Sequence, residues 1–302
     1  MAQPETTQRI DEIATEALTA LGTGRQVTPF SSRYPGFALA DAYNIAARIR
    51  DLRATRGETP IGRKIGFTNR AVWGGYGISG PIWNFVFDRT VRDLAATGET
   101  FPLTGLAEPR IEPEIILHVA SAPRPDMSDD ELLSCIDWVA HGFEVVHSIF
   151  PNWTFTAADA VAAYGVHGAL LIGDRHPISG HRSCWAKALS NFSVELLRGD
   201  GVRVRGHARD VLGGPVQALR FLIQELARYS ARDPLAPGEI VTTGTLTEAM
   251  PAIPGDTWNT AQWHRDRRPS ATVSVTSTQR RSAECPPRLK PGNGPLHRPA
   301  SA

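Results

Sequence analysis

The sequence changes character at Ile61, and this change limits the folds that the chain can adopt. Before it, residues 8–22 carry apolar side chains at helical spacing, and a second helical pattern follows Asp41. After it, short β-type runs such as IGRKIGFTN and IWNFVFDRTV alternate with glycine-rich turns. Many short strands without regular βαβ alternation favour an α+β fold, in which a helical or mixed N-terminal portion precedes a mixed β core.

The later part of the chain continues this pattern. A capping box of Ser128 and Glu131 predicts a third helix, and its apolar stripe would be Leu132, Cys135, Ile136 and Val139. Residues 190–206 predict a hairpin with Gly-Asp-Gly at its turn. A further helix follows Pro215, with an apolar stripe of Val216, Leu219, Ile223 and Leu226. Strands are expected at EIVTTGT and ATVSVT.

Three parts are expected along the chain. Residues 1–60 form the helical N-terminal portion, and residues 61–278 form the β domain that carries the chemistry. From residue 279 to 302 prolines, arginines and small residues dominate, a composition typical of a disordered tail.

Charge and composition narrow the class of partner. The 302 residues include 32 basic and 31 acidic ones, for a formal net charge of +1. No excess of one sign favours nucleic acid or an anionic membrane, so a small molecule is the expected partner. The three cysteines form no CxxC pair, and neither a signal peptide nor a membrane-spanning run is recognisable. We expect a cytoplasmic protein.

The segment PRIEPEIILH contains the main chemical signal. In a strand, residues two apart share a face, so Glu112 and Glu114 would lie side by side and repel each other. A solvated face, a lysine or arginine partner, or a divalent metal would relieve this repulsion. Pro113 lacks the N–H that a ladder needs and so suggests an edge strand beside a cleft. Mg²⁺ and Mn²⁺ prefer oxygen ligands of this kind.

Glu144 is a candidate third ligand. It lies in GFEVVHSIF, where its neighbours are apolar, aromatic, glycine or histidine. An unpaired buried carboxylate is costly, so Glu144 needs a partner. A salt bridge to an arginine would satisfy it, but the cation already required by Glu112 and Glu114 makes a shared metal site the preferred interpretation.

Lys64 also lies in an apolar setting, followed by Ile65, Gly66 and Phe67. It could bind an anionic substrate, or it could be an ordinary lysine whose ammonium reaches solvent. Arg63, on the opposite face, is expected to be solvated. The histidines belong to no HxH or HExxH metal motif, which favours packing roles or support of the ligands for them, and His147 or His167 is also a candidate general acid or base.

Taken together, these stretches resemble the fumarylacetoacetate hydrolase superfamily, in particular its branch of 2-keto-4-pentenoate (2-hydroxydienoate) hydratases and 4-oxalocrotonate decarboxylases. The likeness runs from about Tyr34 to Val275 and rests on the order of KIGFT, the ExE of RIEPEI, a later FE and the TTGT strand. It implies a mixed β-roll in which Glu112, Glu114 and Glu144 bind Mg²⁺ or Mn²⁺. It also implies that Lys64 acts on a bound 2-oxo acid, and it suggests a homo-oligomer.

The same resemblance places the substrate contacts and ranks the reactions. Substrate contacts are expected from Lys64, from Ile82 and Trp83 of PIWN, and from Gly244 and Thr245 of TTGT. Hydratases of this family carry an acidic residue where Ile82 stands, and an apolar residue there is more like the decarboxylases. We expect a metal-dependent lyase, first a hydratase and second a decarboxylase. An acylpyruvate-type C–C hydrolase ranks third, and an inactive binding partner of a related enzyme fourth.

Overall fold

Two β-sheets and the helices around them make up the structure, which is a computed structural model describing residues 4–98, 100–231, 233–263 and 271–276. Within these residues the larger sheet has eight strands in the order β2-β1-β10-β5-β6-β7-β3, with β11 beside β5. The smaller sheet has five, in the order β4-β13-β12-β8-β9. This mixture confirms the predicted α+β class. The predicted tail at 279–302 lies outside the described residues.

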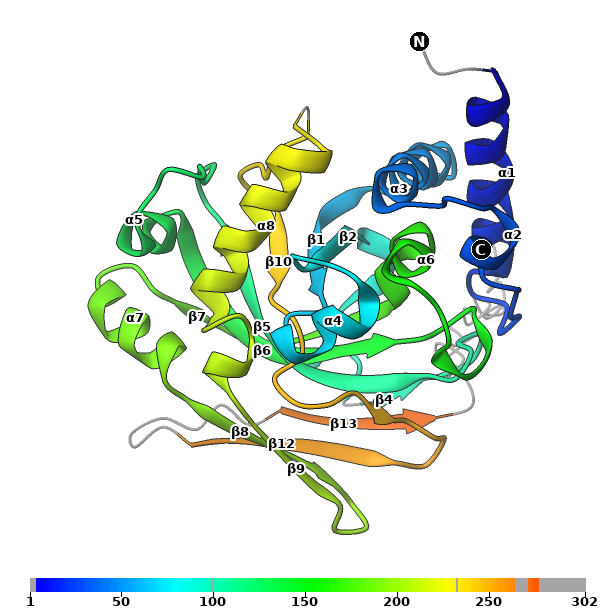
Figure 1. Ribbon diagram of the computed structural model, residues 1–302. Helices are drawn as coiled ribbons and strands as arrows, with labels where there is room; N and C mark the ends of the chain where they lie inside the picture. Colours follow the sequence, from blue (N-terminus) through cyan, green and yellow to red (C-terminus); the bar gives the residue numbers. More distant parts are fainter. Residues whose placement is uncertain (1–3, 99, 232, 264–270, 277–302) are drawn as a thin grey trace, which may run out of the picture.

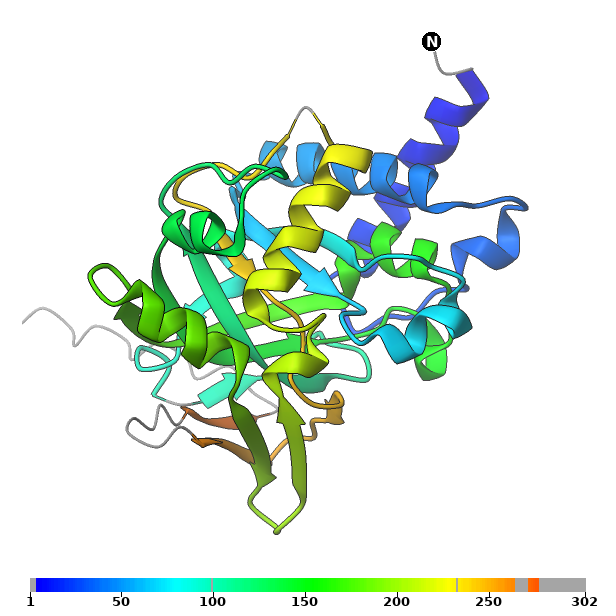
Figure 2. The same ribbon diagram turned by 60° about the vertical axis from the view of Figure 1, so that its left-hand side comes forward.

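The strands have the following bounds. In the larger sheet they are β1 (Pro60–Gly66), β2 (Ile82–Phe87), β3 (Val91–Asp93), β5 (Arg110–Val119), β6 (Ile136–Val146), β7 (His167–Pro177), β10 (Ile240–Thr242) and β11 (Met250–Pro251). In the smaller sheet they are β4 (Thr100–Pro102), β8 (Ser193–Arg198), β9 (Arg203–His207), β12 (Thr257–Trp263) and β13 (Ala271–Thr276). The predicted hairpin is β8–β9, which projects from the body of the molecule in both views (Figures 1 and 2).

Helices cover the larger sheet on the side away from the smaller one (Figure 1). They are α1 (Pro4–Ala20), α2 (Phe30–Arg33), α3 (Leu39–Thr55), α4 (Trp73–Tyr76), α5 (Asp129–Ser134), α6 (Ala157–Ala162), α7 (Arg182–Ser190) and α8 (Pro215–Tyr229). The predicted stripe of α8 is confirmed, because Leu219, Ile223 and Leu226 are buried. No helix in the described ranges is both long and apolar enough to cross a bilayer.

The hydrophobic core joins the N-terminal helices to the sheet. One cluster contains Ile13 of α1 and Ile45 of α3 together with Ile65 of β1 and Trp83 of β2. A second cluster lies between the two sheets and includes Phe143 of β6. The division of the chain into parts at residues 60 and 278 stays a prediction.

The predicted helical stripe after Ser128 was wrong in its second half. The third helix ends at Ser134, and Ile136 and Val139 belong to β6 instead of a helical stripe. Their apolar side chains are buried on the sheet, so tertiary packing prevailed over helical spacing. The capping box of Ser128 and Glu131 is present as predicted.

Arg63 is buried instead of solvated. Its Nη1 donates a 2.6 Å hydrogen bond to Glu239, and its guanidinium lies 4.3 Å from the ring centre of Phe85. These partners compensate the loss of water around the charge.

The strand that carries the ExE motif is central, not at an edge. β5 pairs with β6 on one side and with β10 and β11 on the other. Pro113 lies opposite the loop that connects β10 to β11, and its carbonyl accepts from the N–H of Leu246 in that loop. The N–H and C=O of one strand residue point to the same side of the strand. At position 113 that side faces the irregular loop, where no regular ladder needs a backbone N–H, so proline is tolerated in this central strand. This loop also opens the sheet next to the glutamates.

Candidate metal centre

Three carboxylates meet on one face of β5 and β6. Glu112 is directly opposite Glu144 in the antiparallel register, and Glu114 is opposite Gly142, one same-face position along. One oxygen from each of the three carboxylates lies within 4.8 Å of the others. Glu114 and Glu144 are fully buried, and Glu112 is half-buried. The structure therefore brings together the three glutamates predicted as ligands.

Neighbouring strands fix the orientation of Glu114. The hydroxyl of Thr242, at the end of β10, donates to Glu114 Oε2. The N–H of Gly244 donates to the same oxygen over 2.8 Å. Gly244 has a φ of 98°, and a Cβ there would lie 2.3 Å from Thr68 Oγ1, so only glycine allows this close turn.

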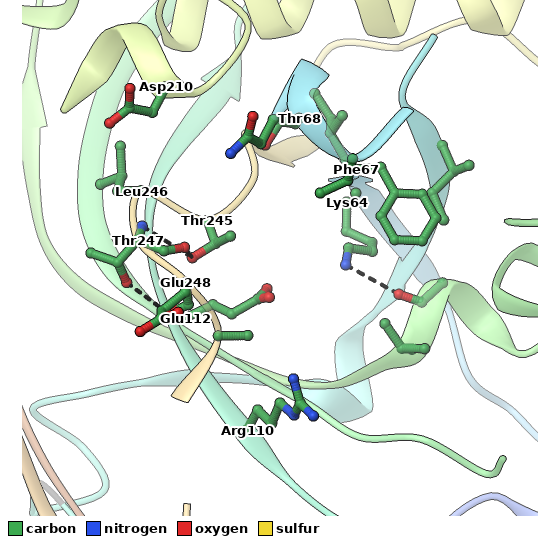
Figure 3. Close-up of a pocket in the computed structure, with 18 of the residues that line it drawn as sticks. Lys64, Phe67, Thr68, Arg110, Glu112, Asp210, Thr245, Leu246, Thr247 and Glu248 are labelled. Atoms are coloured by element: carbon green, nitrogen blue, oxygen red, sulfur yellow. Dashed lines mark hydrogen bonds between the residues drawn. The ribbon is translucent and has the colours of Figure 1, made fainter. Parts of the chain in front are cut away.

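Glu144 is held by two cationic or donor groups. Its Oε1 accepts a 2.7 Å hydrogen bond from Nδ1 of His167, and its Oε2 lies 3.3 Å from Nζ of Lys64. His167 is in turn fixed by Thr90, whose hydroxyl is 2.8 Å from Nε2. Lys64 also donates to the carbonyl of Gly165 over 3.1 Å, as Figure 3 shows.

The electrostatics of this cluster are unbalanced. Burial raises the pKa of Glu114 well above its usual range, and repulsion from Glu144 and Glu112 raises it further. Burial likewise raises the pKa of Glu112. Burial acts in the same sense on Glu144, but Lys64 and His167 outweigh it and lower that pKa. Three carboxylates share a single close ammonium, so their full ionisation would create an excess of negative charge, and the raised pKa values of Glu112 and Glu114 reflect this cost.

The donor set fits a hard divalent cation. Glu114 Oε1 is buried and accepts no hydrogen bond from a donor in the described part of the chain, and Glu144 Oε2 forms an ion pair with Lys64. Buried oxygens in folded proteins are rarely left in this state. A divalent cation would satisfy them and offset the excess charge.

A cavity of about 420 Å³ opens next to the cluster. Lys64 and Glu112 line it, whereas Glu114 and Glu144 lie behind its surface. The remaining lining residues come from five parts of the chain (Figure 3). These are β1 with the segment that leads from it to the start of β2, the start of β5, the segment 153–166, the segment 205–210, and the loop between β10 and β11. A molecule in this cavity can therefore contact both the ammonium and the accessible carboxylate.

The residues predicted to bind substrate divide into two groups. Ile82 and Thr245 line the cavity. Trp83 is buried outside the lining, where it stacks on Tyr43 with ring centres 4.8 Å apart. Gly244 is also outside the lining, and its N–H serves Glu114 instead.

His147 lies near the cluster but does not line the cavity. It is buried, neither ring nitrogen has a hydrogen-bond partner in the described part of the chain, and it stacks on Tyr164 at 5.6 Å. Burial lowers the pKa of His147 to about 4, so its ring is neutral at physiological pH.

Sequence reasoning missed several lining residues. Arg110 lines the cavity beside Glu112, and its guanidinium lies 4.3 Å from the ring centre of Trp153. The strand alternation that pairs Glu112 with Glu114 also puts Arg110 on their face, so this residue was within reach of the pattern. Trp153 and Phe155 come from a distant loop, and no local signal places them here.

Known proteins similar to this chain include several hydratases. No protein-family model matches the sequence. A 2-hydroxyhexa-2,4-dienoate hydratase of Comamonas testosteroni is 30% identical over 241 residues, covering 78% of this chain and 87% of that protein. A 2-keto-4-pentenoate hydratase of Burkholderia vietnamiensis is 30% identical over 240 residues, with 78% and 87% covered.

The solved structures show the same fold. The 4-oxalocrotonate decarboxylase of Pseudomonas putida G7, complexed with magnesium and adipate, has a TM-score of 0.80 at 22% identity, covering 89% of this chain and 98% of that one. A fumarylacetoacetate hydrolase family protein of yeast has a TM-score of 0.53 at 17% identity, with 72% and 92% covered. The chain belongs to the family of 2-hydroxydienoate (2-keto-4-pentenoate) hydratases that these relatives represent, and it shares its fold with the decarboxylase and the fumarylacetoacetate hydrolase family protein.

Proposed function

We propose that this protein is a divalent-metal-dependent lyase of 2-oxo and 2-hydroxydienoic acids, and specifically a hydratase of the 2-keto-4-pentenoate type. The observation that carries the proposal is the cluster of Glu112, Glu114 and Glu144, with unsatisfied buried oxygens, next to Lys64 and a cavity. The hydratases that are 30% identical over most of the chain support the same reaction class.

The three glutamates would hold Mg²⁺ or Mn²⁺. When bound, such a cation supplies stabilisation of the negative charge that develops on a 2-oxo or 2-hydroxy group during reaction. Thr242 and His167 orient the carboxylates from behind, which keeps the ligand oxygens directed towards one point.

Lys64 contributes a fixed positive charge. Burial alone would lower its pKa, but Glu144, Glu112 and Glu114 raise it above its usual value. The group therefore stays an ammonium, which can donate to an anionic oxygen of the substrate but cannot act as a base. Arg110 supplies a second cation in the lining, suited to the substrate carboxylate.

The reaction also requires a proton donor at the cavity wall, close to the substrate carbon that is remote from the carboxylate. Catalysis by His147 stays a prediction, since it requires the ring to reach a cavity that it does not line in this structure. A cytoplasmic location and a homo-oligomeric state also stay predictions from the sequence.

Decarboxylation is the second candidate function. Ile82 is an apolar part of the cavity lining at the position where hydratases of the family carry an acid. An apolar wall there favours the loss of a charged carboxylate over the addition of water.

One assay separates the two reactions. The purified protein with Mg²⁺ or Mn²⁺ is incubated with 2-hydroxypenta-2,4-dienoate and, separately, with 2-oxohex-3-enedioate, while dienol absorbance and CO₂ are followed. Loss of dienol without CO₂ is expected. Release of CO₂ from the diacid, without hydration of the dienoate, would replace the hydratase with the decarboxylase.

The role of Lys64 has its own test. Lys64→Ala is expected to abolish turnover and to retain divalent-metal binding, because the three carboxylates remain and lose a competing cation. Calorimetric titration with Mn²⁺ measures the binding. A variant that loses the metal as well would show that Lys64 is structural.

A further inference from the structure

One side of the cavity is built from aromatic rings. Phe67 and Tyr76 stack with ring centres 4.3 Å apart, Tyr76 lies 6.4 Å from Phe155, and Phe155 lies 6.0 Å from Trp153. All four residues line the cavity. We call these four residues the aromatic wall. Three aliphatic side chains complete its surface: Val72, Ile82 and Val166. Such a surface favours an apolar ligand group.

Two residues of the aromatic wall have an unfavourable backbone conformation. Phe67 has a φ of 56° and Trp153 a φ of 54°, in the left-handed region that bulky residues rarely adopt. Hydrogen bonds maintain both: the indole N–H of Trp73 donates to the carbonyl of Phe67 over 2.7 Å, and that of Trp153 donates to Glu108 over 3.0 Å. Strain of this kind concentrates at ligand-binding sites.

The charges of the lining residues disfavour a second carboxylate on the ligand. Asp210 and Glu248 line the cavity, and Figure 3 shows them on the side opposite Phe67. Lys64 is paired with Glu144, and Arg205 with Glu195 over 3.0 Å. Among the described lining residues, Arg110 is the cation without an ion-pair partner. The lining thus matches one carboxylate and repels a second that would reach the acidic side.

The size of the cavity indicates a ligand larger than a five-carbon acid. Its volume of about 420 Å³ lies in the range of roughly 300–1,000 Å³ that holds drug-sized ligands. A five-carbon dienoate has only eight heavy atoms, so a cavity of this size has space for a further substituent beside Phe67, Tyr76 and Phe155.

We propose that the substrate is a monoanionic 2-oxo or 2-hydroxydienoic acid with a bulky apolar substituent, such as a phenyl group, at the end remote from the carboxylate. Phe67, Tyr76 and Phe155 of the aromatic wall receive this substituent, whereas Trp153 lies against the guanidinium of Arg110. The inference rests on the proposed function for the reacting end and adds the identity of the distal end.

Substrate preference tests the inference. We compare kcat/KM for 2-hydroxypenta-2,4-dienoate, for its 5-phenyl derivative and for 2-oxohex-3-enedioate with Mg²⁺ present. We expect the phenyl compound to exceed the other two by about tenfold or more, because a single methylene in an apolar pocket already changes specificity by about 10–200-fold. Equal or lower kcat/KM for the phenyl compound would overturn the inference and leave the hydratase proposal standing.

A binding measurement separates this inference from the reaction. Calorimetry with Mn²⁺ compares the saturated acids 2-oxo-5-phenylpentanoate and 2-oxopentanoate, which need no turnover. Tenfold tighter binding of the phenyl acid supports the aromatic wall even if no dienoate reacts. Equal affinities contradict it whatever the reaction is.

Two variants locate the effect. Phe155→Ala should reduce the preference for the phenyl compound at least tenfold, whereas Trp138→Ala, a half-buried aromatic outside the cavity, should preserve the ratio. Val72 is 37% exposed, so Val72→Arg should fold even if Phe155→Ala does not. It should lower the phenyl preference and raise the relative rate with the diacid. An unchanged ratio in Val72→Arg would remove the aromatic wall from the binding site.

Discussion

At the scale of single residues, the centre depends on carboxylates that are expensive to bury and are placed by strand register. Glu112 and Glu144 lie on one face because β5 and β6 pair in this register, and a shift of one strand by one residue would put them on opposite faces of the sheet. Lys64 offsets one of three charges. When all three carboxylates are ionised, the remaining negative charge favours a bound cation. Removal of any one ligand should therefore lower the affinity for the metal.

The first prediction concerns a ligand. Glu144→Gln keeps the shape of the side chain but removes its charge. We expect Mn²⁺ affinity to fall by at least about 100-fold and turnover to be lost. This loss should exceed the roughly 10–100-fold typical of residues that hydrogen-bond to a metal ligand. Glu225→Gln, a half-buried glutamate on α8 outside the cluster, is the matched control. Calorimetric titration measures both. Unchanged Mn²⁺ affinity in Glu144→Gln would refute the site.

The second prediction concerns His167, for which the sequence favours packing or support of a ligand, with general acid or base as the alternative. The structure makes it a positioning residue, since it donates to Glu144 and is anchored by Thr90. His167→Ala should weaken Mn²⁺ binding by about 10–100-fold, and Thr90→Val should have a smaller effect in the same direction. His167→Asn, which can still donate to Glu144, should recover part of the affinity. If metal binding is unaffected while turnover is lost, His167 acts on the substrate instead.

At the scale of elements, the β8–β9 hairpin supports the loop that closes the cavity. Gly206 of β9 approaches the carbonyl of Leu246 so closely that a Cβ would lie 1.7 Å from that oxygen. Leu246 lines the cavity, and its N–H donates to Pro113, between the two glutamates of the motif. The hairpin, the loop and the motif strand therefore form one connected unit.

This contact gives a prediction for the element. Gly206→Ala should push β9 from the loop, lower the free energy of unfolding by about 1–3 kcal/mol, and raise KM through displacement of Leu246. Gly199→Ala in the same hairpin is the control, because a Cβ there meets nothing nearer than 3.7 Å. Urea unfolding and steady-state kinetics measure both variants. Equal stability of the two would show that the hairpin can move without cost.

The elements also show which features could be predicted from the sequence. The β8–β9 hairpin and α8 carry their own local signals, a Gly-Asp-Gly turn and an apolar stripe, and both were predicted. Ile136 and Val139 fit a helical stripe and a buried strand equally well, and only the neighbouring strands decide between them.

Residues far apart in sequence account for the rest of the misses. The charge of Arg63 is compensated by Glu239, which lies 176 positions away along the chain. The aromatic wall likewise combines the turn after β1 with the loop after β6. Within the metal centre, the alternation of one strand predicts Glu112 and Glu114. Glu144 was predicted because a lone buried glutamate needs a partner, but its place opposite Glu112 depends on strand pairing.

At the scale of the whole molecule, the metal centre lies where the main elements converge. β5, β6 and β10 supply its ligands and their supports, β1 supplies Lys64, and the cores on either side of the larger sheet pack against these same strands. Repulsion among the carboxylates therefore acts at the centre of the fold. A cation that removes this repulsion and binds only the folded chain should stabilise the entire protein.

Thermal unfolding tests this coupling. A divalent cation at 100 times its dissociation constant adds about 2.7 kcal/mol, and for a chain of this size each kcal/mol raises Tm by roughly 2–4 °C. Saturating Mg²⁺ or Mn²⁺ should therefore raise Tm by roughly 5 °C or more over protein treated with EDTA. The shift should vanish in Glu144→Gln and persist in Glu225→Gln. Na⁺ at equal ionic strength should not reproduce it, since screening alone does not fill the unsatisfied oxygens of Glu114 and Glu144. An equal rise in Glu144→Gln would mean that the stabilising cation binds elsewhere on the protein.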